Sequence, residues 1–177
     1  MAGVLLHICC GICSSGAIQR LLDDGYSVTG FFYNPNIHPE SEYRKRLEAA
    51  HVVGSLLDIE MVIGAYDQER WVERTTGLES EPEGGKRCSE CFRLRLEGTY
   101  TKAGELGFSY IASTLSISPH KNCEVISQIG RSIAQDAFLP YDFKKQDGFK
   151  KASAFSKLHN IYRQNYCGCV YSIRDTL

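Results

Sequence analysis

The chain of 177 residues carries 20 lysines and arginines against 21 aspartates and glutamates, and 43% of its residues are hydrophobic. This composition is typical of one globular domain and excludes a disordered chain. The net charge of -1 excludes a uniformly basic surface, so any polyanion site has to be a local patch. No secretory signal or membrane-spanning apolar stretch is visible, so we expect a cytoplasmic protein without membrane contact.

Predicted strands and helices alternate along the first third of the chain. Apolar or β-branched runs predict strands at 4–8, 27–33 and 59–63. The predicted helices between them run from an N-cap at Ser14 or Ser15 to Asp24, and over 40–57. This alternation predicts a parallel sheet with helices on both faces.

The rest of the chain is less regular. Helix formers predict helices over 66–75, 88–107 and 122–135, and apolar runs predict strands at 110–113 and 137–141. A glycine-containing loop is expected at 77–85, and the chain is basic and aromatic from Phe143 onward.

Seven of the eight cysteines fall into three groups: Cys9, Cys10 and Cys13, then Cys88 and Cys91, and finally Cys167 and Cys169. The first group follows the first predicted strand, and ligands bind at the carboxyl ends of strands in open parallel sheets. The second group begins a predicted helix, whose N-terminus favours thiolates. Cys123 stands alone, and we interpret it as a core or surface cysteine.

The number of grouped thiols indicates a metal site. In a reducing compartment, grouped cysteines are metal ligands or catalytic groups, and thiolates suit iron–sulfur clusters, zinc or Cu(I). Seven exceed the four of one structural zinc or one cluster, which suggests a second metal, an open coordination position or a redox-active dithiol. We therefore predict a single metal-binding α/β domain over 1–177 that holds iron. A closed zinc site and a secreted disulfide scaffold are the alternatives.

Five blocks of the sequence resemble the QueH-type epoxyqueuosine reductases. They span His7–Cys13, Arg87–Leu96, Ser113–Lys121, Asp142–Phe149 and Ile161–Cys169. The resemblance implies a HUP-like α/β fold, related to PP-loop nucleotide-binding proteins, with a cysteine-rich metal site at the carboxyl ends of the strands. Gly11 and Ile12 stand where the family pattern has Ala-Pro, a departure that leaves the thiols in place.

The resemblance also implies an activity. It is the two-electron reduction of the epoxide of epoxyqueuosine at the wobble position of tRNA, which gives queuosine. The implied cofactors are a [4Fe-4S] cluster and an additional mononuclear iron, and the expected electron donor is a ferredoxin or flavodoxin. All seven grouped cysteines are expected metal ligands. Their division between the two centres stays open, with Cys9, Cys10, Cys88 and Cys91 as the predicted cluster-binding residues.

The matching blocks also supply candidates for proton transfer and substrate binding. His120, Asp142 and Tyr162 are the candidate catalytic acids, although each has a simpler interpretation as a helix cap, an ion-pair partner or a core residue. Basic side chains contact phosphates, and aromatic ones stack on splayed bases. The predicted tRNA-binding residues are Arg87, Arg93, Lys121, Lys144, Lys145 and Arg163.

Three other functions compete with this one. A PP-loop tRNA thiolase needs a Ser-Gly-Gly-x-Asp-Ser loop for pyrophosphate; the segment 9–16 lacks its aspartate, so we expect no ATP requirement. A zinc-stabilised RNA-binding module predicts a colourless protein without redox activity. A dithiol oxidoreductase using Cys88 and Cys91 would lack the usual apolar helix context.

Overall fold

The computed structural model describes residues 1–173, and its centre is a four-stranded parallel sheet. The strands are β1 (Gly3–Ile8), β2 (Ser27–Phe32), β3 (Glu60–Ile63) and β4 (Tyr110–Ser113), arranged in the order β3-β2-β1-β4. β1 pairs with β2 on one side and with β4 on the other. Its residues 4–8 are buried, which explains their continuous apolar run.

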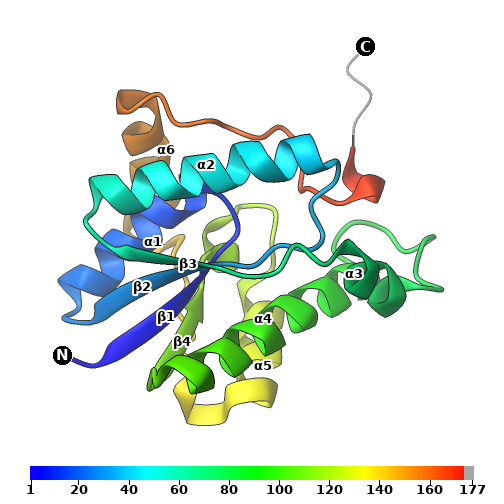
Figure 1. Ribbon diagram of the computed structural model, residues 1–177, viewed down its shortest axis with the longest axis horizontal. Helices are drawn as coiled ribbons and strands as arrows, with labels where there is room; N and C mark the ends of the chain where they lie inside the picture. The colour runs from blue at the N-terminus through cyan, green and yellow to red at the C-terminus, as the bar shows by residue number, and fades with distance from the viewer. Residues whose placement is uncertain (174–177) are drawn as a thin grey trace.

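Helices cover both faces of this sheet (Figure 1). On one face α1 packs against α2 and α6, and on the other α4 packs against α3 and α5. Their bounds are α1 (Gly11–Asp23), α2 (Glu40–Leu56), α3 (Gln68–Thr75), α4 (Lys86–Leu106), α5 (Cys123–Ala134) and α6 (Gly148–Leu158). The predicted parallel α/β architecture is confirmed. No helix within residues 1–173 combines the length and apolarity needed to cross a bilayer.

The strand order places a crevice beside the end of β1. The chain moves from β1 to β2 and β3 on one side and then returns to β4 on the other. Such a reversal opens a ligand-binding crevice outside the carboxyl ends of the two diverging strands. Cys9 follows β1 and Thr114 follows β4, and the Cys9 amide donates to Thr114 Oγ1 at 3.0 Å.

The start of α1 differs from the prediction. The helix begins at Gly11, because the Cys10 thiol acts as its N-cap and accepts the Cys13 amide at 3.4 Å. The predicted caps lie inside the helix: Ser14 donates to the Gly11 carbonyl and Ser15 to the Ile12 carbonyl.

Two predictions for the second half of the chain were also incomplete. The strand predicted at 137–141 is wrong, because only an isolated bridge joins Phe138 to Ile111, and Pro140 cannot donate to a ladder. Helix α6 was not predicted. Its fully buried residues are the small Ala152 and Ser156, and its larger apolar residues, Phe149 and Phe155, are partly buried against the core. It packs closely on α1: a Cβ at Gly16 would lie 3.0 Å from the Gly148 carbonyl oxygen.

Candidate metal centre

Three thiols converge at the carboxyl end of β1. The Sγ atoms of Cys9, Cys10 and Cys13 all lie within 4.8 Å of one another, and all three residues are buried. They meet because Cys9 directly follows β1, Cys10 caps α1 and Cys13 lies in the first turn of that helix. This arrangement suits a soft metal ion.

The other four grouped cysteines lie around the start of α4. Cys91 and Cys169 share a buried cluster with Trp71 and Leu94. Burial raises the pKa of the Cys88 and Cys91 thiols, and negative charge at Cys167 raises both further. Within the described part of the chain, no three of these four sulfurs approach as closely as the first three do. Cys123 stands apart from both groups, with its Sγ 3.9 Å from the Tyr141 carbonyl oxygen. This position agrees with its interpretation as an isolated cysteine.

Arg95 lies between the two thiol groups. Its side chain donates to Asn34 Oδ1 at 2.7 Å and approaches Cys91 Sγ at 3.9 Å, and only 3% of the residue is exposed. No carboxylate of residues 1–173 forms an ion pair with it. An uncompensated buried cation is strongly destabilising, so Arg95 favours ionisation of the neighbouring cysteines: its charge acts to lower the pKa of both Cys9 and Cys91.

A neutral histidine lies behind this arginine. Burial, reinforced by the charge of Arg95, lowers the pKa of His7 to about 3. Its ring nitrogens contact Ser113 Oγ at 3.0 Å and the Tyr33 carbonyl oxygen at 3.1 Å. The imidazole is therefore neutral and adds no second positive charge beside Arg95. Its hydrogen bonds connect the end of β1 to the ends of β4 and β2.

The first thiol group has unequal acidity. Hydrogen bonds from Cys10 and Cys13 lower the pKa of Cys9 despite burial, and the charges of Arg95 and Lys121 lower it further. For Cys10, the hydrogen bond with Cys13 acts to lower the pKa of the thiol. The hydrogen bond with Cys9 and burial of the thiol have the larger combined effect, and they raise this pKa to about 12. Cys9 is therefore the most acidic thiol of the group, and Thr114 Oγ1 lies 3.2 Å from its sulfur.

A cavity of about 490 Å³ lies beside these thiols, and the cysteines that line it are Cys9, Cys13 and Cys167. Its volume suits a nucleoside-sized ligand. Lys121 lies on its wall; burial opposes its charge, but Cys167, Cys9 and Cys13 raise its pKa, so it remains a cation. The other polar or charged lining residues include Arg46, Arg95, Ser118, His120, Arg163, Gln164, Asn165 and Tyr166. Cysteines and cations thus line the cavity together, with the carboxylate of Glu83 also in its lining.

The structure brings some predicted site residues to this cavity and leaves others away from it. His120, Lys121 and Arg163 line it, whereas Asp142 and Lys145 line a second cavity. Tyr162 lines neither, and its hydroxyl donates to Glu42 at 2.6 Å.

Three predicted tRNA-binding residues are engaged within the protein. Arg87 is buried and donates to the carbonyls of Leu78, Glu79 and Glu81. Arg93 donates to Ser132 Oγ at 3.2 Å, and the Lys144 ammonium donates to the Lys121 carbonyl at 3.0 Å. These contacts organise the loops around the site.

Sequence reasoning missed two further residues at the site. Arg46 of α2 is buried and donates to the carbonyls of Cys167 and Tyr166 at 2.9 and 3.0 Å. The Trp71 indole N–H is buried without a hydrogen-bond partner among residues 1–173, and it lies close enough to Cys91 to favour its thiolate. No local sequence signal identifies either residue, because their partners are distant along the chain.

The geometry defines a class: a HUP-like parallel α/β domain with a thiol-lined cavity where the strand order reverses. The U34-tRNA thiolase NcsA of Methanococcus maripaludis, solved with its [4Fe-4S] cluster, shares this fold. The TM-score is 0.58 at 15% identity, covering 98% of this chain and 62% of that one.

The family model for epoxyqueuosine reductase QueH matches residues 4–175, and the chain belongs to this family. The epoxyqueuosine reductase QueH of Acinetobacter baylyi is 41% identical over 177 residues, which cover 98% of this chain and 81% of that protein. The Streptococcus pyogenes serotype M1 protein of the same name is 39% identical over 180 residues, covering 97% and 70%. The resemblance carried by the five sequence blocks is confirmed.

Proposed function

We propose that this chain is an iron–sulfur-dependent epoxyqueuosine reductase that removes the epoxide oxygen of epoxyqueuosine in tRNA. The observation that carries the proposal is the thiol-lined, basic cavity in a chain that matches this family over residues 4–175. The reaction takes two electrons and two protons, breaks both C–O bonds of the epoxide, leaves an alkene and releases water.

The residues present fit a thiolate-bound iron centre. Three sulfurs lie within 4.8 Å of one another, Arg95 supplies a buried positive charge, and the Trp71 N–H is free to donate toward Cys91. We assign the cluster to Cys9, Cys10, Cys88 and Cys91, which leaves Cys13, Cys167 and Cys169 for an additional mononuclear iron. When bound, these centres supply the low-potential electrons that no side chain provides.

The chain's own residues bind the substrate and handle the protons. Lys121 and Arg163 line the cavity as cations and suit the phosphates next to the modified nucleotide. His120, at the exposed edge of the same cavity, is the proposed donor of the proton that the departing oxygen takes up. With His120 as the proton donor, Asp142 and Tyr162 have structural roles. The Asp142 carboxylate accepts a hydrogen bond from the Lys144 amide, and the Tyr162 hydroxyl donates one to Glu42.

The proposed partners follow from this reaction. The substrate is tRNA carrying epoxyqueuosine at the wobble position, and the electrons come from a low-potential donor of the ferredoxin or flavodoxin type. The released alkene product is queuosine in the same tRNA.

Anaerobic purification tests the proposal. We expect a brown protein with acid-labile sulfide and more iron than one cluster holds, which converts epoxyqueuosine-containing tRNA when given a reductant. Cys88→Ser and Cys91→Ser should lower the sulfide content and abolish conversion, whereas Cys123→Ser, the matched control, should leave both unchanged. A colourless protein with one zinc and no sulfide would instead indicate an RNA-binding module.

A further inference from the structure

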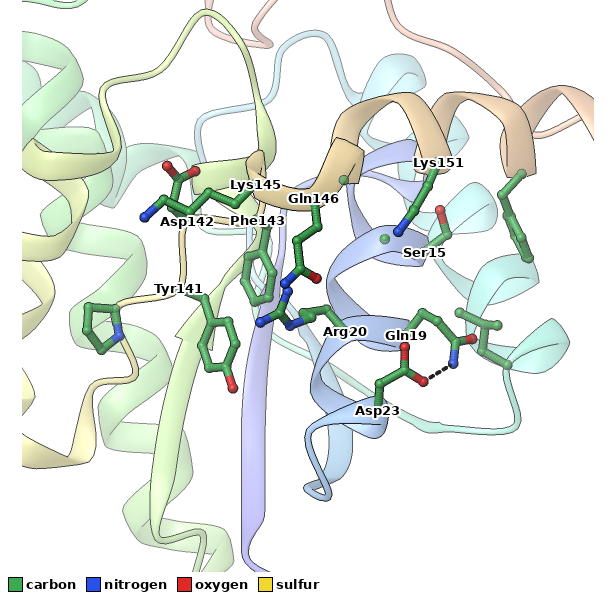
Figure 2. A pocket seen from close by; sticks show the side chains of 15 residues that line it. Ser15, Gln19, Arg20, Asp23, Tyr141, Asp142, Phe143, Lys145, Gln146 and Lys151 are labelled. Carbon is green, nitrogen blue, oxygen red and sulfur yellow. Dashed lines mark hydrogen bonds between the residues drawn. The ribbon is translucent and has the colours of Figure 1, made fainter.

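A second cavity, of about 560 Å³, lies between the segment 140–148 and helices α1 and α6 (Figure 2). Gly148 lines this cavity and the next residue, Phe149, lines the metal-site cavity, so the two cavities are neighbours. Figure 2 shows the side chains of Gln146 and Lys151 pointing from above toward α1. The proposed reaction makes no use of this cavity.

The floor of the second cavity carries hydrogen-bonding groups held in place. The Gln19 amide donates to Asp23 at 2.8 Å, which leaves the amide oxygen of Gln19 and one Asp23 oxygen for a ligand. Arg20 and the Tyr141 hydroxyl both donate to Asp24, at 2.9 and 2.7 Å, which fixes one wall. Amide and carboxylate groups of this kind recognise the edges of nucleobases.

The walls combine flat apolar rings with free cations. Tyr141 stacks on Phe143 with ring centroids 5.1 Å apart, and Phe155 is a further aromatic residue of the lining. Lys145 and Lys151 are exposed at the cavity and form no ion pair within residues 1–173. Aromatic rings for stacking, beside lysines for phosphate, are the groups that single-stranded RNA requires.

The loop above the cavity is held in an unfavourable backbone conformation. Gln146 and Asp147 are consecutive non-glycine residues with φ values of 58° and 60°. Each costs roughly 1 kcal/mol or more, so the surrounding packing has to maintain them. This conformation directs the Gln146 side chain toward α1, where it completes the set of base-recognising groups.

We propose that the second cavity binds the nucleotide next to the modified one in the anticodon loop, an inference that rests on the proposed function. Bases of a single-stranded loop splay apart readily, so neighbouring nucleotides can enter neighbouring cavities. The modified nucleotide occupies the sulfur-lined cavity. Its neighbour places its base against the aromatic lining of this cavity, above Gln19 and Asp23, with its phosphate at Lys145 and Lys151.

The test measures binding of anticodon stem-loop RNAs to the anaerobically prepared protein by fluorescence anisotropy. Each loop base next to the wobble position is replaced in turn by an abasic site. The Gln19→Ala/Lys151→Ala variant is compared with Gln128→Ala/Lys150→Ala, which removes the same groups at exposed positions outside both cavities. We expect about tenfold weaker binding for the first variant and less than twofold for the control.

The abasic RNAs decide whether a base occupies the cavity. Removing one flanking base should weaken wild-type binding about tenfold and leave binding by the cavity variant unchanged. The inference is overturned if an abasic site weakens binding equally for wild type and for the cavity variant. It is also overturned if the cavity variant binds the intact RNA as tightly as wild type does. Neither result affects the proposed reductase function. Tight binding of free GMP or UMP that does not compete with the stem-loop overturns it as well. A wild-type protein that neither binds nor reduces the RNA removes the proposed function itself.

Discussion

Arg95 is a cation buried in the protein interior. Among residues 1–173, its side chain forms hydrogen bonds only with neutral groups and with a cysteine sulfur. Its partners Asn34 and His7 are neutral, so they orient the guanidinium without neutralising it. A buried charge without compensation costs several kcal/mol, whereas the same charge stabilises an anionic centre beside it. Arg95 therefore favours thiolates and any additional negative charge that enters the site.

Replacing Arg95 by glutamine should lower the reduction potential of the centre. Without the positive charge, the more negative reduced state is less stable, and the shift should be on the order of 50 mV. Arg95→Lys keeps the charge and should keep most of the potential. Spectroelectrochemistry of the anaerobic proteins measures both. An unchanged potential in a fully iron-loaded Arg95→Gln protein would show that this charge does not act on the centre.

Tyr162 makes a contact that depends on its proton. Burial raises its pKa to about 12, and the hydrogen bond to Glu42 contributes to the increase. Between pH 10 and 12 the unfolded chain therefore loses a proton that the folded protein retains. The stabilisation is fully present below pH 10 and is lost as the pH rises through about 12.

Tyr162→Phe should consequently be less stable than wild type by about 1 kcal/mol at pH 8, with the difference decreasing above pH 10. Urea unfolding at pH 8, 10 and 11 measures this difference, and the other tyrosines cancel because both proteins contain them. The variant should retain turnover when fully loaded with iron. Loss of turnover without loss of iron would instead make Tyr162 the catalytic acid.

At the scale of elements, α2 anchors the segment that carries the last two thiols. Arg46 donates to Glu42 at 2.7 Å and to two carbonyls of that segment, and the His38 amide donates to the Gly168 carbonyl at 2.7 Å. Both Arg46 and Glu42 are buried. One ion pair on a helix therefore determines where Cys167 and Cys169 lie.

Arg46→Ala should destabilise the protein by about 3 kcal/mol, because it leaves Glu42 buried without its partner. It should also lower the iron content, since the segment loses two hydrogen bonds to its backbone. Arg44→Ala is the matched control: Arg44 pairs with Glu40 on the same helix, but on the exposed side, and should cost about 0.5 kcal/mol or less. Equal effects of the two variants on unfolding and iron content would contradict this role.

Pattern and propensity predicted most of the elements and the first thiol group. The strand Tyr110–Ser113 and the helix over 40–57 were recognised because apolar runs and helix formers report directly on local structure. Helix α6 was not predicted, although Phe149, Ala152 and Phe155 recur at helical spacing. The start of α1 was misplaced because a thiol replaces the usual hydroxyl cap. The role of Arg95 was not predictable, since its partners Asn34 and His7 come from other elements.

Across the whole molecule, charge is nearly balanced but unevenly placed. The net charge is -1, yet Arg95, Lys121 and Arg163 line the first cavity, and Lys145 and Lys151 line the second. Cations outnumber carboxylates in both linings, where the carboxylates are Glu83 in the first cavity and Asp23 and Asp142 in the second. A cleft with an excess of one sign of charge attracts the opposite charge. A polyanion should therefore approach this face in spite of the acidic balance elsewhere.

Binding of anticodon stem-loops should weaken with salt, with a slope of log K against log salt of about -2 to -3 for three or four phosphate contacts. Arg163→Ala should make this slope less steep by about 0.7, the value for one single-strand phosphate. Lys157→Ala, an exposed lysine of α6 outside both cavities, should not change it. Titrations between 50 and 300 mM KCl measure the slopes, and identical slopes for all three proteins would rule out a phosphate contact at Arg163.

The three cysteine groups join the site at different stages of chain synthesis. The strand end and first helical turn around Cys9, Cys10 and Cys13 are local in sequence and form early. Cys167 takes its place through contacts of its segment with residues far along the chain, among them Arg46, 121 residues away. A nascent chain therefore presents a partial thiolate site, attractive to zinc, before the remaining ligands exist. Correct metal loading has to follow folding, and the timing of metal delivery becomes part of making this protein active.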